Sequence, residues 1–512
     1  MTNIGASELN LGGVYDILFN DKKLKISEHT VLEMKASFDF LKEISENKVV
    51  YGINTGLGPM AQYKIEPEEQ LQLQYNLIRS HSSGSGSPLS PIHVKSAMVC
   101  RLNTLSQAHS GVHPDVANVI ISMVNNDITP LIPSHGGVGA SGDLVQLAHL
   151  ALVVIGEGEV FYQNEKRPTK KVFEELNIKP LKVHLREGLG MINGTSVMSG
   201  IGLVNIIDSY RLMNWSILAA SMINELVSSF SDHFSEELNE VKQHKGQHII
   251  ASAMRKSMDD SQLIRDRCDF LFDGTLKGNE YQQKIQEYYS LRCIPQILGP
   301  IHDTIQNAEE VLVSEVNSVS DNPVIDHKRR KVFHGGNFHG DYVSLEMDKL
   351  RLAIIKLSML SERQTNYLMN DKLNGILPPF VNLGKKGFNL GMQGVQFTAT
   401  STVAENQSLG TSLYIHSIPN NNDNQDIVSM GANSALATDK VIENTFEIMA
   451  IEILTLVQAI EYLKIQDKLS SISREIYNDI RIIVPSFSED TTKYQELANI
   501  KEYLKTKKLN LL

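Results

Sequence analysis

VIENTFEIMAIEILTLVQAIEYL, residues 441–463, is the stretch that most clearly indicates the fold class. Its apolar residues recur at alternating spacings of four and three, which is the period of an α-helix. They are Ile442, Phe446, Met449, Ile453, Leu456, Ile460 and Leu463. A second apolar set covers much of the opposite side, namely Val441, Ile448, Ile451, Leu454 and Val457. Such a helix is about 30 Å long, and its apolar surface all round places it inside a bundle or a subunit interface.

The rest of the chain predicts a mainly α fold with an irregular N-terminal lobe. MDKLRLAIIKLSML, residues 347–360, repeats the helical period, whereas the first third mixes short β-prone pieces with Gly-rich loops. HSSGSGSPLSP (81–91) predicts a mobile loop, and GEVFYQNEKRPT (158–169) predicts a small hairpin with Thr169 as the N-cap of a following helix. We therefore expect a lobe of short helices, loops and minor β-hairpins over residues 1–192. A long central helical bundle is expected over residues 193–512.

The composition limits the class of protein. The chain has 512 residues, of which 42% are hydrophobic and 21% are charged, as is typical of a soluble globular protein. Its net charge of −11, with no stripe of lysine and arginine, argues against nucleic-acid binding. The three cysteines are too few and too scattered for a disulfide framework. No secretory signal and no apolar stretch of membrane-spanning length is evident, so we expect a cytoplasmic protein with no membrane association.

HGGVGASGDLVQLAHLAL, residues 135–152, places a Gly-rich loop directly before an apolar helical run. The plain interpretation is a flexible turn with Asp143 as the N-cap of the helix. The chemical interpretation is that the Gly142 nitrogen attacks the carbonyl carbon of Ala140 and closes a five-membered ring. Loss of water from the ring and from Ser141 leaves a methylidene on an imidazolone, which is a strong electrophile. Glycine keeps the attacking nitrogen uncrowded, serine supplies the leaving hydroxyl, and alanine fits a compressed turn.

Tyr51 and Asn193 lie in two further loops that interrupt the predicted elements. Tyr51, in YGINTGLG, is either a half-buried core tyrosine or a general base whose anion nearby cations stabilise. Asn193, in INGTS, suits a turn and a helix cap. HGGNFHG (334–340) and NNNDNQD (420–426) are dense in amides, so they form either helix junctions or a site.

Arg292, in YYSLRCIPQILGP, is the best candidate for a bidentate clamp on a carboxylate, with Tyr289 and Gln286 one turn or less away. A structural ion pair explains this arginine equally well. We expect no metal, because the spacing of His334 and His339 matches no common zinc pattern and no HExxH or CxxC occurs. Nucleophile-elbow, Walker A and dinucleotide-binding patterns are also absent from the sequence.

Taken in order, these loops resemble the aromatic amino acid ammonia-lyase family, which includes histidine, phenylalanine and tyrosine ammonia-lyases and related aminomutases. The resemblance covers the chain from about Tyr51 to Leu463. The motifs that carry it are YGINTGLGP, GGVGASGDLVQLAHLAL, INGTS, YSLRCIPQILGP, DNPVID, GGNFHG and NQDIVSMG. The family implies a mainly α homotetramer with active sites shared between subunits. It also implies a methylidene-imidazolone (MIO) group, formed here from Ala140, Ser141 and Gly142, and no external cofactor.

The resemblance assigns roles to individual residues of this chain. Tyr51 matches the catalytic base on a mobile loop, and Arg292 matches the residue that pairs with the substrate carboxylate. Asn193 and Tyr289 match residues beside the prosthetic group. The remaining matches are substrate-binding positions, namely Gln286, Asn322 and Phe338.

Two positions in the sequence resemble family members that act on different amino acids. Ser80-His81 stands where the family selects the substrate ring, and this pair resembles histidine ammonia-lyases as well as some bacterial tyrosine ammonia-lyases. Gln425, in DNQD, resembles phenylalanine and tyrosine enzymes, because histidine enzymes usually carry a glutamate there. We therefore expect L-tyrosine to be converted to trans-p-coumarate and ammonia, with histidine as the alternative substrate and a tyrosine aminomutase as a further one.

Overall fold

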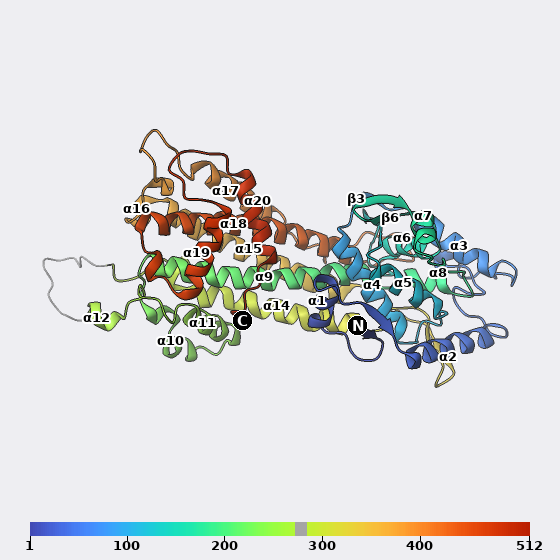
Figure 1. Cartoon of the computed structure of the whole chain (residues 1–512). Helices are drawn as coiled ribbons and strands as arrows, with labels where there is room; N and C mark the ends of the chain where they lie inside the picture. Colours follow the sequence, from blue (N-terminus) through green and yellow to red (C-terminus); the bar gives the residue numbers. More distant parts are fainter. Residues whose placement is uncertain (272–283) are drawn as a thin grey trace. The chain divides into compact units, whose positions relative to one another are not determined.

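A computed structural model describes residues 1–271 and 284–512, and this part of the chain is mainly helical, as predicted (Figure 1). Its four longest helices are α9 (Ser196–Leu226), α14 (Ile294–Val316), α15 (Asp341–Met369) and α18 (Gly431–Leu463). No helix in the two described ranges is both long and apolar enough to cross a lipid bilayer.

The described chain divides into two compact units. Unit 1 comprises Met1–Ile207, Ala308–Asp348 and Ser412–Asp439, and unit 2 comprises Asp208–Asn307, Lys349–Thr411 and Lys440–Leu512. The expected division at residues 192 and 193 stays a prediction. Because each long helix has residues in both units, the units are interleaved along the sequence.

Unit 1 contains all the strands in the described residues, arranged in four small sheets. Its shorter helices are α1 (Leu11–Phe19), α2 (Glu28–Ser45), η1 (Gly58–Met60), α3 (Gln70–His81), α4 (Pro91–Ser106), α5 (Asp115–Asn125), α6 (Leu144–Val154), α7 (Thr169–Glu175) and α8 (Glu187–Ile192). Strands β1 (Thr2–Ile4) and β2 (Leu24–Ile26) pair in parallel, whereas β3 (Ser85–Pro88) with β5 (Pro133–His135), and β8 (Val324–Asp326) with β9 (Lys331–Phe333), pair antiparallel. The third sheet has the order β4 (Thr129–Pro130), β6 (Glu159–Tyr162) and β7 (Glu165–Pro168).

Two local expectations for unit 1 need correction. The loop over residues 81–91 is not entirely irregular, because Ser85–Pro88 pairs with β5. The hairpin of β6 and β7 is confirmed, but the N-cap of α7 is Pro168, and the Thr169 hydroxyl is buried and has no hydrogen-bond partner in the described part of the chain. Thr169 is instead the first residue of the helix.

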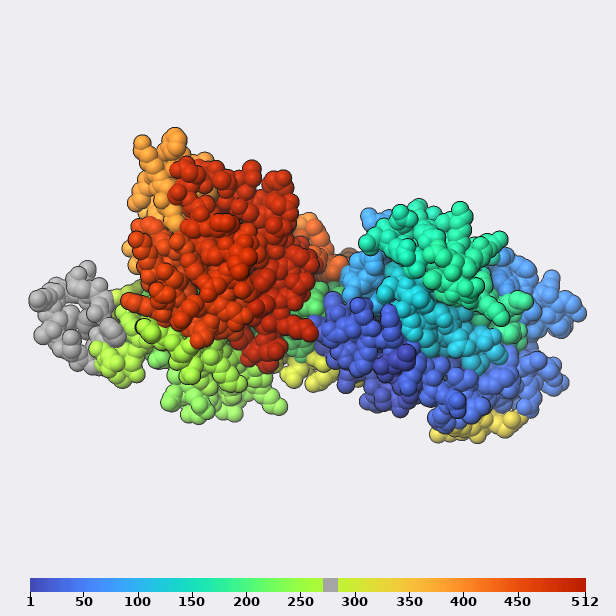
Figure 2. Space-filling model, in the orientation of Figure 1, coloured from blue at the N-terminus to red at the C-terminus, as the bar shows by residue number. Residues whose placement is uncertain are grey.

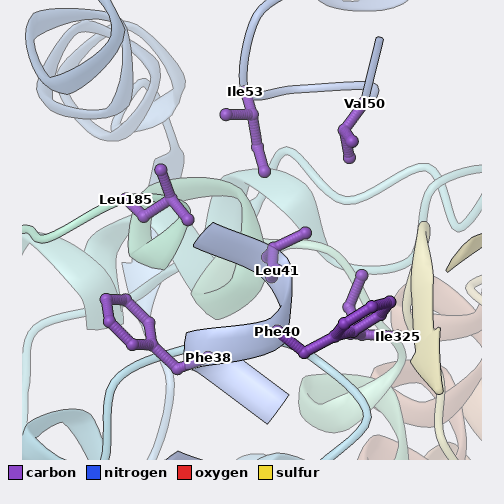
Figure 3. Close-up of a cluster of buried hydrophobic side chains, with 7 residues drawn as sticks. All are labelled: Phe38, Phe40, Leu41, Val50, Ile53, Leu185 and Ile325. Atoms are coloured by element: carbon purple, nitrogen blue, oxygen red, sulfur yellow. The ribbon is translucent and has the colours of Figure 1, made fainter. Parts of the chain in front are cut away.

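A buried apolar cluster fixes the segment that carries Tyr51. Figure 3 shows Val50 and Ile53, which flank Tyr51, near the side chain of Leu41 on α2. The other members are Phe38 and Phe40 on α2, Leu185 before α8 and Ile325 on β8. In Figures 1 and 2 the yellow β8–β9 hairpin lies against the blue helix α2. The backbone on both sides of Tyr51 is therefore anchored in the core, because Val50 and Ile53 are 2% and 0% exposed.

The regular elements of unit 2 in its described part are all helices. Its shorter helices are η2 (Ser231–Phe234), α10 (Glu236–Glu240), α11 (Lys245–Ser257), α12 (Arg267–Leu271), α13 (Tyr289–Arg292), α16 (Asp371–Asn374), η3 (Pro379–Val381), α17 (Gln393–Ser408), η4 (Gln466–Lys468), α19 (Ser471–Ile483) and α20 (Tyr494–Thr506). Both apolar sets of residues 441–463 are fully buried, except for Leu463. The buried Trp215 indole N–H donates to the Leu504 carbonyl of α20 at 2.8 Å. The prediction that this stretch lies inside a bundle is confirmed.

Candidate active site

A cavity of about 900 Å³ in unit 1 brings together most of the predicted site residues. Its walls include Tyr51, His81, Ser141, Asn193, Asn322, Phe338 and Gln425. Its volume falls in the range of small-molecule sites, about 300–1,000 Å³. Ala140 and Gly142 flank Ser141 but are buried, with Ala140 4% exposed. Residues far apart in the sequence therefore meet at one concave surface.

Tyr51 lies in a tight turn that follows α2. Its phenol oxygen accepts a hydrogen bond from the Gly58 N–H at 2.9 Å. Gln74 of α3 donates to the Gly52 carbonyl at 2.9 Å, and Gly52 has a positive φ of +73°. A Cβ atom on Gly52 would lie 2.3 Å from the Leu189 side chain, so only glycine fits there. The Gly58 N–H thus holds the Tyr51 phenol, and the Gln74 side chain holds the backbone directly after Tyr51.

The Ala140-Ser141-Gly142 turn packs directly against the Asn193-Gly194 turn. Gly142 has φ +71°, and a Cβ atom on it would stand 2.0 Å from the Gly194 carbonyl oxygen. The same oxygen accepts a hydrogen bond from the Asp143 N–H at 2.8 Å. The positive φ and the close approach of the Gly194 carbonyl both require glycine at position 142, whereas compression within the turn itself stays a prediction.

Asp143 corrects a prediction about helix capping. It occupies the N-cap position of α6, but its side chain makes no hydrogen bond to that helix. Its carboxylate instead accepts hydrogen bonds from the Val197 and Met198 N–H groups, at 2.8 and 2.9 Å, at the start of α9. Burial raises the pKa of this carboxyl from 3.8 to about 7, although the two N–H groups oppose the shift. Asp143 thus links the starts of two helices.

Two amide side chains hold Ser141. The Gln425 Nε2 group donates to the Ser141 hydroxyl at 2.9 Å, and the Asn193 Nδ2 group donates to the Ser141 carbonyl at 3.3 Å. The Asn193 Oδ1 atom is buried and has no hydrogen-bond partner in the described ranges. A ring built from residues 140–142 fits these surroundings, because two amide donors and an unpaired acceptor lie beside Ser141.

Behind the two turns lies a group of charged residues that no sequence motif indicates. Arg101, Arg186 and Asp321 are buried, and Glu315 is half-buried. Arg101 is fully buried; its guanidinium donates to the Gly190 carbonyl, and burial lowers its pKa to about 10. Burial raises the pKa of Glu315, which accepts a hydrogen bond from the Thr195 hydroxyl. Arg186 pairs with Asp321 at 2.9 Å and also donates to the Asn322 carbonyl at 2.7 Å. These contacts fix the main chain on either side of Asn193 and at Asn322.

His81 lines the cavity at the end of α3. Its Nδ1 atom lies 3.0 Å from the Leu77 carbonyl oxygen, and because a carbonyl can only accept, Nδ1 carries the proton. Burial lowers the pKa of His81, which favours the neutral ring. A neutral ring protonated at Nδ1 has a lone pair on Nε2, so His81 is a hydrogen-bond acceptor for a ligand.

The remaining predicted residues lie in unit 2. Gln286 and Tyr289 line a different cavity, of about 650 Å³, together with Lys284 and Arg363. The Arg292 guanidinium stands 4.8 Å from the centre of the Tyr289 ring, and its buried Nε atom has no hydrogen-bond partner among the described residues. Of the residues that the structure describes, no lysine or arginine lines the cavity that contains Tyr51.

Comparison with known proteins identifies the family of the chain. Residues 9–482 match the family described as "Aromatic amino acid lyase". The chain is 37% identical to a tyrosine 2,3-aminomutase of Myxococcus sp. (strain Mx-B0), over 90% of this chain and 88% of that protein. It is 38% identical to a histidine ammonia-lyase of Caldanaerobacter subterraneus, over 89% of this chain and 86% of that one.

The solved structure of a tyrosine aminomutase from Streptomyces globisporus superimposes with a TM-score of 0.94, at 32% identity. The match covers 98% of this chain and 96% of that chain. Sequence and fold therefore agree over nearly the whole length. The chain belongs to the aromatic amino acid lyase family.

Proposed function

We propose that this chain is a tyrosine ammonia-lyase that converts L-tyrosine to trans-p-coumarate and ammonia. The observation that carries the proposal is the shared cavity of Tyr51, Ser141 and His81, which combines a base, the predicted source of an electrophile and an acceptor for a phenol. The reaction removes a proton from the β-carbon, breaks the bond between the α-carbon and nitrogen, and leaves a double bond between the two carbons.

Members of this family use an MIO group that forms autocatalytically. In this chain Ala140, Ser141 and Gly142 would form it, and Asn193 and Gln425 would hold it through the contacts that they make with Ser141. When formed, the group supplies an electrophile that takes up the substrate amino group and makes it a better leaving group.

Tyr51 is the proposed base for the β-proton. The Tyr51 phenol oxygen accepts a hydrogen bond from the Gly58 N–H, and this bond would stabilise negative charge on the oxygen. A β-proton is weakly acidic, so the base must be held in place, and the anchored residues Val50 and Ile53 restrict the turn. The phenol oxygen of Tyr51 can therefore accept a proton, and the anchored main chain would hold it in position.

His81 and Gln425 support tyrosine as the substrate. A neutral His81 with its proton on Nδ1 can accept the phenol O–H of tyrosine, whereas phenylalanine has no group to donate. Gln425 is neutral, so the cavity lacks a carboxylate at the position where histidine enzymes of this family usually carry one. A site built around an O–H donor discriminates strongly against a substrate without it.

The substrate carboxylate needs a cation that the Tyr51 cavity of one chain does not supply from its described residues. We assign this role to Arg292 of a second copy, with Tyr289 and Gln286 beside it, in a homotetramer whose active sites are shared. An arginine fork suits a carboxylate because two parallel N–H groups can donate to its two oxygens.

Parallel steady-state assays test the substrate. Purified protein is incubated with L-tyrosine, L-histidine or L-phenylalanine, and p-coumarate, urocanate and cinnamate are followed by their absorbance. We expect kcat/KM for tyrosine to exceed that for histidine. Formation of urocanate far faster than p-coumarate would exclude the tyrosine assignment and establish histidine as the substrate.

A tyrosine 2,3-aminomutase is the second candidate, because relatives at 36–37% identity carry that name. An aminomutase returns ammonia to the β-carbon, so its product is β-tyrosine. Chiral chromatography of the same tyrosine reaction separates the two activities. β-Tyrosine as the main early product would favour the aminomutase, whereas p-coumarate with free ammonia in equal amounts would favour the lyase.

A further inference from the structure

We propose that His113, Asp115 and His184 form a zinc-binding site on unit 1, apart from the Tyr51 cavity. None of the three residues lines that cavity. His113 Nδ1 lies 3.1 Å from the Asp115 Oδ2 atom, and His184 Nε2 lies 3.4 Å from the same oxygen. Two imidazoles and one carboxylate are a ligand set that zinc accepts, leaving one tetrahedral position for water.

The separations suit a tetrahedral ion. Zinc lies about 2.0–2.2 Å from nitrogen and carboxylate oxygen, so two ligands at a tetrahedral angle are about 3.3–3.5 Å apart. The His184 distance of 3.4 Å falls in this range, the His113 distance of 3.1 Å is slightly shorter, and all three ligand atoms lie within 4.8 Å of one another. The centroids of the two imidazole rings are 4.3 Å apart, so the rings would reorient around a bound ion.

Zinc at this position would replace an existing contact of His113. The Asp115 N–H donates to His113 Nδ1 at 3.3 Å, and the metal would take the lone pair that accepts this long hydrogen bond. The carboxylate oxygen 3.1 Å away also presents only lone pairs. Nδ1 and Oδ2 are 3.1 Å apart, so an ion bound to both would take the place of the contact between the ring and the carboxylate.

The three ligands come from two separate segments that the same buried residue holds together. Glu187 is 0% exposed. Its Oε1 atom accepts a hydrogen bond from the main-chain N–H of His113 at 2.9 Å, and its Oε2 atom accepts one from the main-chain N–H of His184 at 2.7 Å. The Phe38 ring, which belongs to the core cluster, meets both imidazoles edge-on, with centroids 5.2 and 6.1 Å away. The main chain and the ring of each histidine are thus fixed without the metal.

The proposed zinc site is accessible to solvent, and the ion would have a structural role. The side chains of His113, His184 and Asp115 are 22%, 37% and 53% exposed, so an ion can enter from solvent. Zinc would join the segment before α5 to the segment before α8. Because α8 leads into Asn193, the ion would brace the approach to the Asn193-Gly194 turn.

Zinc binding to the intact chain tests the proposal. Protein freed of its affinity tag is treated with a chelator, desalted and titrated with ZnCl2 by calorimetry, and Co²⁺ absorption reports the coordination geometry. The variants are His184→Gln and Asp115→Asn, and the control is His334→Gln, which removes an exposed histidine from another loop. Circular dichroism confirms that each variant is folded.

We expect one zinc per chain in the unmodified protein and in His334→Gln, with a tetrahedral Co²⁺ spectrum. Affinity should fall at least about 100-fold in His184→Gln and in Asp115→Asn, because loss of even an outer partner of a metal ligand costs about 10–100-fold. Zinc should raise the melting temperature of the unmodified protein and leave that of His184→Gln unchanged. Equal zinc affinity in all four proteins, or no binding to the unmodified chain, would overturn the proposal.

Discussion

The main chain of Gly142 lies against the carbonyl of Gly194 so closely that a Cβ atom on Gly142 would stand 2.0 Å from the Gly194 oxygen. These two glycines belong to different helix-start turns, one before α6 and one before α9. Their contact also includes the hydrogen bond from the Asp143 N–H to the same oxygen. The geometry of the Ala140-Ser141-Gly142 turn therefore depends on a segment fifty residues further along the chain.

Replacing Gly142 with alanine should prevent formation of the ring. The new Cβ would displace the Gly194 carbonyl, and a positive φ costs alanine about 1–2 kcal/mol. Intact-mass spectrometry should show loss of two waters in the unmodified chain and no loss in Gly142→Ala. Gly335→Ala is the matched control, because no heavy atom lies within 4 Å of a Cβ at that position. A Gly142→Ala chain that still loses two waters would contradict the expectation.

Tyr51→Phe should abolish turnover and leave the ring intact. The phenol oxygen is a proposed base, and removing a general acid or base typically costs about 10²–10⁴ in rate. Its only hydrogen bond in the described chain is the one from Gly58, so folding should change little. We expect kcat to fall by about that factor with an unchanged mass. The control is Tyr494→Phe, which alters a tyrosine that is 77% exposed; near-normal kcat in Tyr51→Phe would exclude it as the base.

His81→Phe should shift selectivity from tyrosine towards phenylalanine. The substitution removes the acceptor that we assign to the phenol O–H and leaves an apolar ring in its place. We expect the ratio of kcat/KM values for tyrosine and phenylalanine to fall by at least about 100-fold, since a site that hydrogen-bonds a substrate hydroxyl discriminates by about 10⁴–10⁵. An unchanged ratio would mean that the phenol is bound elsewhere.

Mixed tetramers should recover activity that two inactive variants lack separately. If Arg292 serves the Tyr51 cavity of another copy, co-expressed Tyr51→Phe and Arg292→Ala chains form some sites with both residues intact. We expect the purified mixture to exceed the summed activity of the two variants assayed alone. Co-expression of two differently tagged Tyr51→Phe chains is the control and should stay inactive. A mixture with no gain would place both residues in a site within one chain.

Asp143 should make the protein less stable as pH rises from about 4 to about 7. Its pKa is about 7 in the folded chain, against 3.8 for an ordinary aspartate, because the carboxyl is buried. Between these values the folded chain keeps a proton that the unfolded chain loses, so the free energy of unfolding falls with rising pH, by at most about 1.4 kcal/mol per pH unit. The contribution is complete below pH 4 and is lost as pH passes 7.

Asp143→Asn isolates this effect, because asparagine keeps an acceptor oxygen for the Val197 and Met198 N–H groups but does not titrate. Melting temperature measured from pH 4 to pH 8 should decline less steeply in the variant than in the unmodified protein. Parallel curves would show that Asp143 has an ordinary pKa.

The sequence predicts the periodic parts of this fold well and the packed polar parts poorly. The spacing of residues 441–463 is sufficient to predict a buried helix, because only burial on all sides is compatible with apolar residues on all sides. The small hairpin at residues 159–168 is also predictable from its turn. By contrast, Ser85–Pro88 forms a strand only because β5 lies beside it, and no local pattern indicates that partner.

The candidate site likewise contains residues that sequence motifs identify and residues that only the folded structure identifies. Tyr51, Ser141, Asn193 and Gln425 are identifiable because each belongs to a short motif, and the structure brings these four residues to one cavity. Arg101 and Glu315 belong to no such motif. Arg101 is buried and Glu315 is half-buried because of tertiary packing, and an arginine in a helical sequence is normally solvent-exposed. Likewise Asp143 is a plausible cap for the helix that follows it, and only the folded chain shows that it caps α9.

The contact of Gly142 with Gly194 has a consequence for when the chain becomes reactive. The turn of residues 140–142 has this packing only when the start of α9 contacts the start of α6, and Asp143 joins the two helix starts. If Ala140, Ser141 and Gly142 form the proposed ring, ring formation would follow folding, and an incompletely folded chain would carry three unmodified residues. The fraction of chains that have lost two waters would then measure the fraction of correctly folded molecules.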